Sequence, residues 1–297
     1  MLYVETPDKQ FKSGYVAIVG KPNVGKSTLI NALVGRKLSI VTRRPQTTRH
    51  RVLAILTSED YQVILLDTPG VIKPRYRLHE SMMQNVDSAV ADADLVLFMA
   101  EASSTEPDSL SLERLRGTRS ILAINKIDLV RREDALPLAE KYMGLDIFET
   151  VVPISAKSGY QVDVLLEEIV SRLAPGPQFY PSDVLSEHPE RFFIAELVRE
   201  QVFKQLREEL PYSTQVNVIN LEPRPDGKDL IDAEIVVDRD SQKGIVIGKG
   251  GQQLKKIGSR ARVQIEEFLG REVFLRLHVK VRQGWRDSPG HLKSFGF

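Results

Sequence analysis

The stretch GKPNVGKST, Gly20 to Thr28, combines glycines, a lysine and hydroxyl residues in a spacing that suits phosphate binding. Glycines let backbone N–H groups curl around phosphate oxygens, Lys26 can reach the terminal phosphates, and Ser27 offers a hydroxyl to Mg²⁺. The sequence therefore predicts a phosphate-binding loop rather than a glycine-rich turn without a ligand. Its predicted contact residues are Asn23, Val24, Gly25, Lys26, Ser27 and Thr28.

A second motif, DTPG from Asp67 to Gly70, follows the apolar run QVILL. An acidic side chain after a buried strand can hold Mg²⁺ directly or through water, and the Gly70 N–H can meet a terminal phosphate. Taken singly, DTPG is only a turn. Beside a phosphate loop, it predicts Asp67 and Ser27 as metal ligands.

A third motif, NKID from Asn125 to Asp128, favours guanine over adenine. The Asp128 carboxylate can accept two N–H bonds from the guanine edge, and adenine would leave this acceptor unpaired. The Asn125 amide can serve O6 or N7, and the Lys126 stem can lie across the base. The later motif SAK, formed by Ser155, Ala156 and Lys157, completes the predicted pocket with a backbone N–H for O6.

The elements that must position these motifs are short apolar runs separated by segments with helical spacing. This alternation predicts an α/β domain with a mainly parallel sheet and helices on both faces. Ligands bind at the carboxyl ends of the strands in such a sheet, where the motifs lie. The runs are YVAIV, VLAIL, QVILL, DLVLFM, SILAI and TVVPI.

Together the four motifs resemble the series found in translation-factor-class GTPases, and TRRPQTTRHRV, residues 42–52, resembles the switch I of the Era family of ribosome-assembly GTPases. The resemblance implies a Ras-like P-loop fold, GTP/GDP and Mg²⁺ as cofactors, and GTP hydrolysis through Lys26, Gly70 and a switch I threonine that binds Mg²⁺. Thr47 and Thr48 both qualify. We expect Thr48, because related switches end in Thr-Arg.

Two further residues bear on the rate of hydrolysis. Ras-type enzymes carry a water-orienting glutamine after the DxxG glycine, whereas this chain has Val71, so we expect slow intrinsic turnover. A GTP binder that does not hydrolyse is the alternative. Similar families use an asparagine at the position of Asn23 to hold K⁺, which the resemblance adds as a further cofactor.

A proline-rich stretch, LAPGPQFYPSD, divides the chain. We expect a GTPase domain over residues 1–173, a linker over 174–190 and a second domain over 191–297. The second domain has the predicted order helix, strand, strand, helix, GxxG, helix, strand. This order resembles a prokaryotic-type KH domain, a smaller α+β fold that binds single-stranded RNA.

The GxxG element, Gly248 to Gly251, would let an RNA backbone approach closely. In VFLRLHVKV, residues 273–281, apolar positions alternate with a largely basic face, which predicts a half-buried strand. Trp285 either packs or stacks on a base, and packing is the expectation. The predicted RNA contacts are Gly248, Lys249, Gly250, Gly251, Lys255, Arg260, Arg262, Arg276 and Lys280, with Lys256 beside them.

Composition sets the remaining limits. The chain has no cysteine, which excludes disulfides and thiolate metal sites, and no signal-peptide layout, so a cytoplasmic location is expected. Nothing in the sequence suggests an obligate dimer, so we expect a monomer. Residues 241–297 hold 12 Lys and Arg against 4 Asp and Glu, whereas the first 240 residues hold 29 against 36. The basic end suggests a polyanion partner.

The resemblance implies that this partner is the single-stranded 3′ end of 16S ribosomal RNA during assembly of the 30S subunit. It also implies a weak peripheral association with the inner face of the cell membrane. The competing hypothesis is that the basic domain docks on a protein or on anionic lipid.

Overall fold

The structure is a computed structural model that describes residues 10–115, 117–224 and 227–297 of the chain. Residue contacts divide the chain into two compact units, each with its own core. The amino-terminal unit contains the residues before Lys37, residues 51–68 and residues 86–187, and the carboxy-terminal unit contains residues 37–50, 69–85 and 188–297.

This division cuts across the domain boundaries expected from the sequence, since segments 37–50 and 69–85 group with residues that follow them by more than a hundred positions. Both segments connect strands of the amino-terminal sheet. Contacts with the carboxy-terminal residues, described below, give the physical reason for this grouping. The boundaries at residues 173 and 190 remain sequence-based predictions.

The amino-terminal unit is built on a six-stranded sheet in the order β2-β3-β1-β4-β5-β6. Neighbouring strands are parallel except for β2 and β3, which are antiparallel. The strands are β1 (Lys12–Val19), β2 (Val52–Thr57), β3 (Tyr61–Asp67), β4 (Leu95–Glu101), β5 (Ser120–Asn125) and β6 (Val151–Pro153). The predicted mainly parallel sheet is thereby confirmed.

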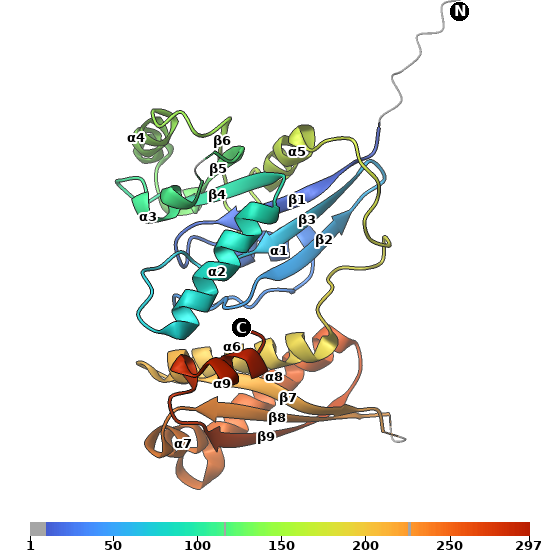
Figure 1. Ribbon diagram of the computed structural model, residues 1–297. Helices are drawn as coiled ribbons and strands as arrows, with labels where there is room; N and C mark the ends of the chain where they lie inside the picture. Colours follow the sequence, from blue (N-terminus) through green and yellow to red (C-terminus); the bar gives the residue numbers. More distant parts are fainter. Residues whose placement is uncertain (1–9, 116, 225–226) are drawn as a thin grey trace, which may run out of the picture. The chain divides into compact units, whose positions relative to one another are not determined.

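Helices lie on both faces of this sheet (Figure 1). Because both faces are covered, consecutive residues along the central strands are buried, and β1 from Val16 to Val19 is fully so. This burial explains why the strands appear in the sequence as continuous apolar runs. The helices of this part of the chain are α1 (Lys26–Val34), α2 (Arg77–Asp92), α3 (Ser109–Leu112), α4 (Arg132–Met143) and α5 (Val162–Arg172).

The proline-rich stretch after α5 is fastened to the amino-terminal sheet. The buried Gln62 side chain on β3 accepts the backbone N–H groups of Phe179 and Tyr180 at 2.8 and 3.0 Å and donates to the Tyr180 carbonyl at 2.8 Å. Further along, the Ile55 N–H of β2 donates to the Leu185 carbonyl at 2.9 Å. Residues 174–187 therefore belong to the amino-terminal unit as an ordered strap.

The carboxy-terminal unit contains a three-stranded sheet in the order β7-β8-β9, with an antiparallel and then a parallel pairing. Its element order, helix, strand, strand, helix, helix, strand, is the one predicted from the sequence. The elements are α6 (Glu190–Gln205), β7 (Gln215–Glu222), β8 (Asp229–Val237), α7 (Asp240–Ile247), α8 (Gln252–Leu269), β9 (Val273–Val281) and the terminal α9 (Pro289–Ser294).

The core of this unit confirms two sequence patterns. On α8 the apolar residues at helical spacing are buried, with Ile257, Ala261 and Ile265 fully inside. On β9 Val273 and Val279 face the same core, whereas Phe274 on the opposite face is half exposed. Helical and strand periodicity therefore predicted correctly which side of each element packs inward.

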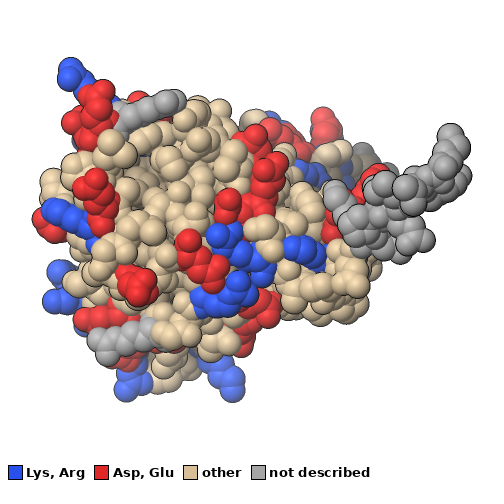
Figure 2. Space-filling view, turned by 90° about the horizontal axis from the view of Figure 1, so that it is seen from above, with Lys and Arg blue, Asp and Glu red and all other residues tan. Residues whose placement is uncertain are grey.

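Surface charge is mixed on the face shown in Figure 2, where Lys and Arg side chains lie among Asp and Glu side chains. This mixing accords with the net charge of +1 for the whole chain. Within the ranges that the structure describes, we find no helix long and apolar enough to cross a bilayer.

Candidate functional site

The phosphate-loop motif lies where the sequence predicts it, between the end of β1 and the start of α1. Asn23 and Gly25 both have positive φ angles, 65° and 107°. A Cβ atom on Gly25 would lie 2.1 Å from the Asn125 amide nitrogen, so a side chain would be excluded by space as well as by conformation. The loop precedes a helix amino terminus, whose N–H groups and dipole favour an anion. Val24 is buried and Thr28 is half buried.

Lys26 points back over this loop. Its ammonium donates to the carbonyls of Gly20 and Lys21 at 3.0 and 2.9 Å. Burial lowers the pKa of Lys26 to about 8, and the carboxylates of Asp67 and Asp108 act against this shift. A desolvated ammonium held by two carbonyls can exchange these partners for phosphate oxygens, which carry full charge.

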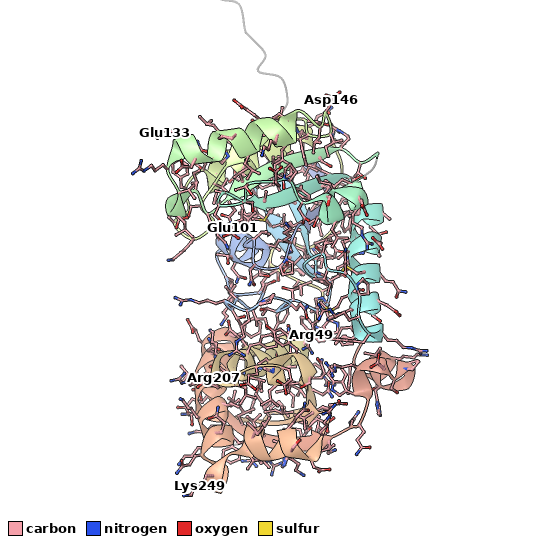
Figure 3. The ribbon with its side chains drawn as sticks, turned by 90° about the vertical axis from the view of Figure 1, so that its left-hand side faces the viewer. Arg49, Glu101, Glu133, Asp146, Arg207 and Lys249 are labelled. Atoms are coloured by element: carbon pink, nitrogen blue, oxygen red, sulfur yellow. The ribbon has the colours of Figure 1, made fainter. Side chains whose placement is uncertain are left out.

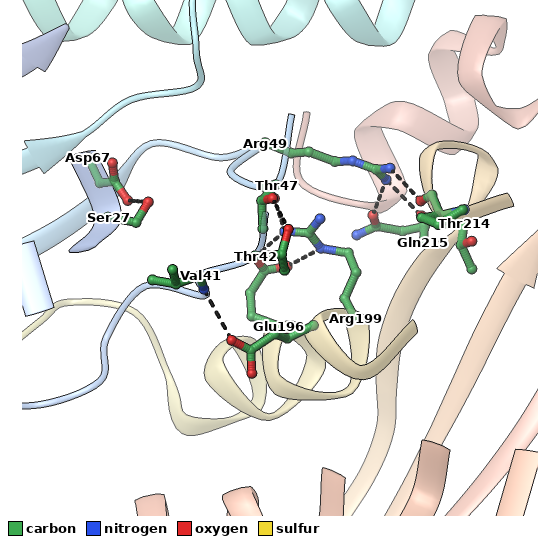
Figure 4. A network of polar contacts seen from close by, with 12 residues as sticks. Ser27, Val41, Thr42, Thr47, Arg49, Asp67, Glu196, Arg199, Thr214 and Gln215 are labelled. Carbon is green, nitrogen blue, oxygen red and sulfur yellow. Dashed lines mark hydrogen bonds and ion pairs between the residues drawn. The ribbon is translucent and has the colours of Figure 1, made fainter. Parts of the chain in front are cut away.

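Ser27 and Asp67, the two predicted metal ligands of this unit, lie together. The Ser27 hydroxyl donates to the Asp67 carboxylate at 2.8 Å, and Asp67 is fully buried at the end of β3 (Figure 4). Among the described residues, no cluster of three or more acidic, histidine or cysteine side chains could hold a metal alone. A hydroxyl and one carboxylate nevertheless fit Mg²⁺, which usually completes its shell with water and substrate phosphates.

Asn125 joins two parts of the predicted pocket. Its amide nitrogen donates to the Val24 carbonyl at 2.7 Å, and its amide oxygen accepts the Ala156 N–H at 2.9 Å. The side chain is 2% exposed. Asn125 therefore ties the phosphate loop to the SAK motif, and its contact with a base stays a prediction.

The remaining residues of the base pocket surround the end of β5. Asp128 is exposed in a short turn, where its carboxylate is accessible to a ligand. Lys126 adopts a positive φ of 66°, and its ammonium contacts Glu101 at 2.9 Å. Ser155 is buried, with its hydroxyl accepting the Ser158 N–H, and Lys157 is exposed.

Sequence reasoning missed two acidic residues of this site, Glu101 beside Lys126 and Asp108 near Lys26. Glu101 ends β4, so the rule that ligands gather at the carboxyl ends of strands could have found it. Asp108 lies in a connection and is 8% exposed. We find no local signal for Asp108, since only the fold brings it to the lysine.

Thr48 and Gly70 belong to the carboxy-terminal unit, unlike the other predicted nucleotide residues. The neighbouring Thr47 hydroxyl is already bonded to the Thr42 hydroxyl and the Arg44 carbonyl, at 2.7 and 2.8 Å. Gly70 and the following Val71 are buried. The predicted switch residues therefore pack in the carboxy-terminal unit.

The GxxG element has the backbone that the sequence predicts. Gly248, Gly250 and Gly251 all have positive φ, at 72°, 58° and 79°. A Cβ on Gly248 would come within 2.7 Å of the Gln253 Cβ, so only glycine fits there. Lys249 is exposed and projects from this loop (Figure 3). The loop offers open backbone and one cation to a phosphate chain.

Basic side chains near this element fall into two groups. On α8, Lys255, Lys256 and Arg260 are exposed, and Arg262 is exposed while paired with Glu266 at 3.0 Å. On β9, acidic residues of the neighbouring β8 already hold the predicted contacts. Arg276 forms two bonds with Asp232, at 2.5 and 2.6 Å, and Lys280 contacts Glu234 at 2.9 Å. The basic face of β9 is therefore largely neutralised.

Trp285 packs, as the sequence predicts. Trp285 is fully buried, and its indole N–H donates to the Ser213 carbonyl at 3.0 Å. His278 is exposed on β9. Packing rather than base stacking accounts for the tryptophan.

Comparison with known proteins agrees with this geometry. Residues 15–126 match the family described as 50S ribosome-binding GTPase, and residues 209–286 match the KH domain family. The chain is 49% identical over 294 residues to "GTPase ERA1, chloroplastic" of Zea mays and 47% identical over 300 residues to "GTPase ERA-like, chloroplastic" of Arabidopsis thaliana. These alignments cover 96% and 98% of the chain, and 70% of each relative.

Two solved structures match the described fold with a TM-score of 0.92 and 39% identity, each covering 96% of this chain and 99% of the other. One is Aquifex aeolicus Era bound to GDP and AlF4⁻. The other is Era in complex with MgGDPNP and nucleotides 1506–1542 of 16S ribosomal RNA.

A phosphate loop, a guanine motif and a KH domain in one chain define a GTPase with an appended RNA-binding domain, and this chain hydrolyses GTP to GDP. Within that class, the chain belongs to the Era family. The predicted family and fold are confirmed. The expected cytoplasmic location, peripheral on the cell membrane, is wrong, because these relatives are chloroplastic. Sequence motifs of a folded domain carry no signal for compartment.

Proposed function

We propose that the chain is a GTP-driven switch that binds the 3′-end region of small-subunit ribosomal RNA and assists assembly of the 30S subunit. The observation that carries this proposal is the presence of two features in one chain. One is a phosphate loop bonded to the guanine motif, and the other is a GxxG element with open backbone. The Era complex with MgGDPNP and a 16S ribosomal RNA fragment supports the same pair of ligands.

On the nucleotide side, the side chains of Ser27 and Asp67 would hold Mg²⁺, together with Thr48. Bound Mg²⁺ supplies charge neutralisation of the phosphates. Lys26 and the Gly70 N–H stabilise the terminal phosphoryl group. The hydrogen bonds already made by the Thr47 hydroxyl support Thr48 as the switch threonine. Val71 is aliphatic and buried, which supports slow turnover.

Asn23 is proposed as the K⁺ residue. It lies in the loop with a φ of 65° and is exposed, which supports a position close to bound phosphates. The test is the GTP hydrolysis rate with K⁺ and with Na⁺ as the only monovalent cation. Equal rates in the two salts would remove K⁺ from the proposal.

On the RNA side, the GxxG backbone with Lys249, Lys255 and Arg260 forms the first contact surface. Their exposure supports phosphate contacts, which fix the register of a bound strand. Arg262, Arg276 and Lys280 join this surface only when RNA phosphates replace their present carboxylate partners.

The proposed working form is a monomer. The compartment that the names of the relatives support is the chloroplast. The competing function, docking of the basic domain on a protein or anionic lipid, keeps the GTPase but changes its cargo. Exposed cations on α8 are the observation that allows it.

The deciding experiment is equilibrium binding of a labelled single-stranded oligonucleotide from the 3′ end of 16S ribosomal RNA to the full chain, with a non-hydrolysable GTP analogue and with GDP. We expect tighter binding with the analogue. Lys249→Glu should weaken it, whereas the control Lys228→Glu, on an exposed lysine paired with Glu272, should not. Equal affinity in both states would contradict the switch. If the oligonucleotide bound in neither nucleotide state, and liposome binding survived Lys249→Glu, the docking function would be favoured.

A further inference from the structure

Arg49, next to the predicted switch threonine, is buried in the carboxy-terminal unit with 2% of its surface exposed. Its guanidinium donates to the carbonyls of Thr214, Tyr212 and Pro211 at 2.7, 3.0 and 3.1 Å and to the Gln215 side chain at 3.3 Å (Figure 4). Burial of a cation is costly unless its donors are satisfied, and this site supplies four acceptors.

Two aromatic rings complete the surroundings of this guanidinium. The rings of Phe203 and Trp285 each lie with their centroids 5.9 Å from the Arg49 guanidinium carbon. Trp285 also donates to the Ser213 carbonyl, in the middle of the acceptor segment. Residues 211–215 and Trp285 therefore form a preformed binding site for one arginine side chain.

On the other side of Thr48, the carbonyl of Thr47 accepts a bond from the Arg199 guanidinium at 2.5 Å. Arg199 on α6 is fully buried, and its Nε donates to the Glu196 carboxylate at 2.7 Å. Both chain neighbours of Thr48 are thus fixed to the RNA-binding domain. Thr48 cannot be displaced far without disturbing one of them.

Segment 69–85, which begins within the DTPG motif, contacts the domain at the residues just after Trp285. The Arg286 guanidinium lies 4.8 Å from the centroid of the Tyr76 ring, and the Asp287 carboxylate accepts the Arg77 N–H at 3.1 Å. Cation–π and charge-assisted contacts of this kind hold a backbone in place. Segments 37–50 and 69–85 therefore both contact the part of the domain around Trp285.

A short series of polar contacts connects the residues around Trp285 with the GxxG loop. The Asp238 carboxylate, directly after β8, accepts the Gly284 N–H at 2.6 Å and contacts Arg286 at 3.8 Å. Gln242 in the first turn of α7 accepts the Asp238 N–H at 2.9 Å. Helix α7 ends at Ile247 and Gly248 caps it, so the orientation of the helix directs the loop.

We propose that Arg49 is the positioning residue that couples the nucleotide state sensed by Thr48 to the RNA-binding domain. This inference rests on the proposed function. Any nucleotide-dependent movement of Thr48 must either carry residues 211–215 with it or break the bonds of a buried cation. Nucleotide binding and the state of the RNA-binding domain are linked in both cases, and linkage is reciprocal.

The test measures this reciprocity with the full chain. The dissociation constant of a fluorescent GTP analogue is determined without RNA and with saturating rRNA 3′-end oligonucleotide. We expect RNA to tighten nucleotide binding by at least about 5-fold in the natural chain. In Arg49→Lys the ratio should fall to near one, because a single ammonium cannot span four acceptors.

Arg51→Lys is the matched control, since Arg51 lies two residues away and instead contacts Asp92 in the amino-terminal unit. Trp285→Phe is a milder second variant that retains a ring but loses the bond to Ser213, and it should lower the ratio partly. Thermal unfolding confirms that each variant folds. A ratio unchanged in Arg49→Lys would overturn this inference alone, whereas a ratio of one in the natural chain would overturn the proposed switch and the inference with it.

Discussion

The Asn125 amide donates to the Val24 carbonyl at 2.7 Å and thereby joins the base-recognition motif to the phosphate loop. The two residues are 101 positions apart in the chain. One side chain thus makes the geometry of the phosphate site depend on the strand that carries the guanine motif. Loss of this bond should affect every nucleotide alike.

Asn125→Ala should weaken GTP and GDP binding by a similar factor, about 10- to 100-fold. The substitution leaves the Val24 carbonyl and the Ala156 N–H without their partner. The site is then less well preformed, which should cost about 1–3 kcal/mol of nucleotide-binding free energy. Isothermal titration calorimetry with GTP, GDP and ATP gives the dissociation constants that test this expectation. Preference for guanine over adenine should persist, because Asp128 is retained; a selective loss of that preference would contradict the positioning role.

Asp128→Asn should change base preference instead. The carboxylate accepts two N–H groups of guanine, whereas an amide presents one acceptor and one donor, which matches xanthine at the same edge. We expect GTP hydrolysis at micromolar substrate to be lost and XTP hydrolysis to appear. Steady-state rates with both nucleotides check this, and unchanged GTP use would exclude Asp128 from base recognition.

Gln62→Leu should destabilise the amino-terminal unit by about 1–3 kcal/mol, because the Phe179 and Tyr180 N–H groups lose their acceptor. Thermal and urea unfolding of the full chain give the difference. Gln178→Leu is the control, since Gln178 lies in the same strap but is exposed. Equal stability of the two variants would show that the strap is not held by Gln62.

His79 should make stability fall in mild acid. Burial lowers its pKa to about 4, and the charges of Arg49, Arg286 and Arg75 act in the same direction. The unfolded chain therefore binds the proton first, near pH 6.5, so the contribution of His79 is complete above that pH and is lost as pH falls toward 4. Solvent screening keeps this loss below the roughly 3 kcal/mol that the full shift would represent.

Comparison of the natural chain with His79→Gln isolates this contribution. The free energy of unfolding of the variant, measured by urea between pH 7 and pH 4, should depend less steeply on pH. His278→Gln, on an exposed histidine, serves as the control. Parallel curves for the natural chain and His79→Gln would mean that His79 titrates normally.

The sequence alone determined the chemistry of the two sites. Lys26, Asp67 and Asp128 each follow a buried strand at the predicted edge, because the spacing of motifs after apolar runs is a local property. The same holds for the inward faces of α8 and β9, where periodicity decides which side packs. The GxxG backbone also follows from residue type, since glycine alone adopts such φ angles readily.

Only the tertiary structure decided which partner each polar side chain found. The bonds of Asn125 to Val24 and of Arg276 to Asp232 are partners that no sequence motif indicated. Nothing in the sequence around Arg49 indicated that four acceptors bury its side chain. These partners come from strand order and register, which depend on contacts between residues far apart in the chain and leave no periodic trace in its sequence.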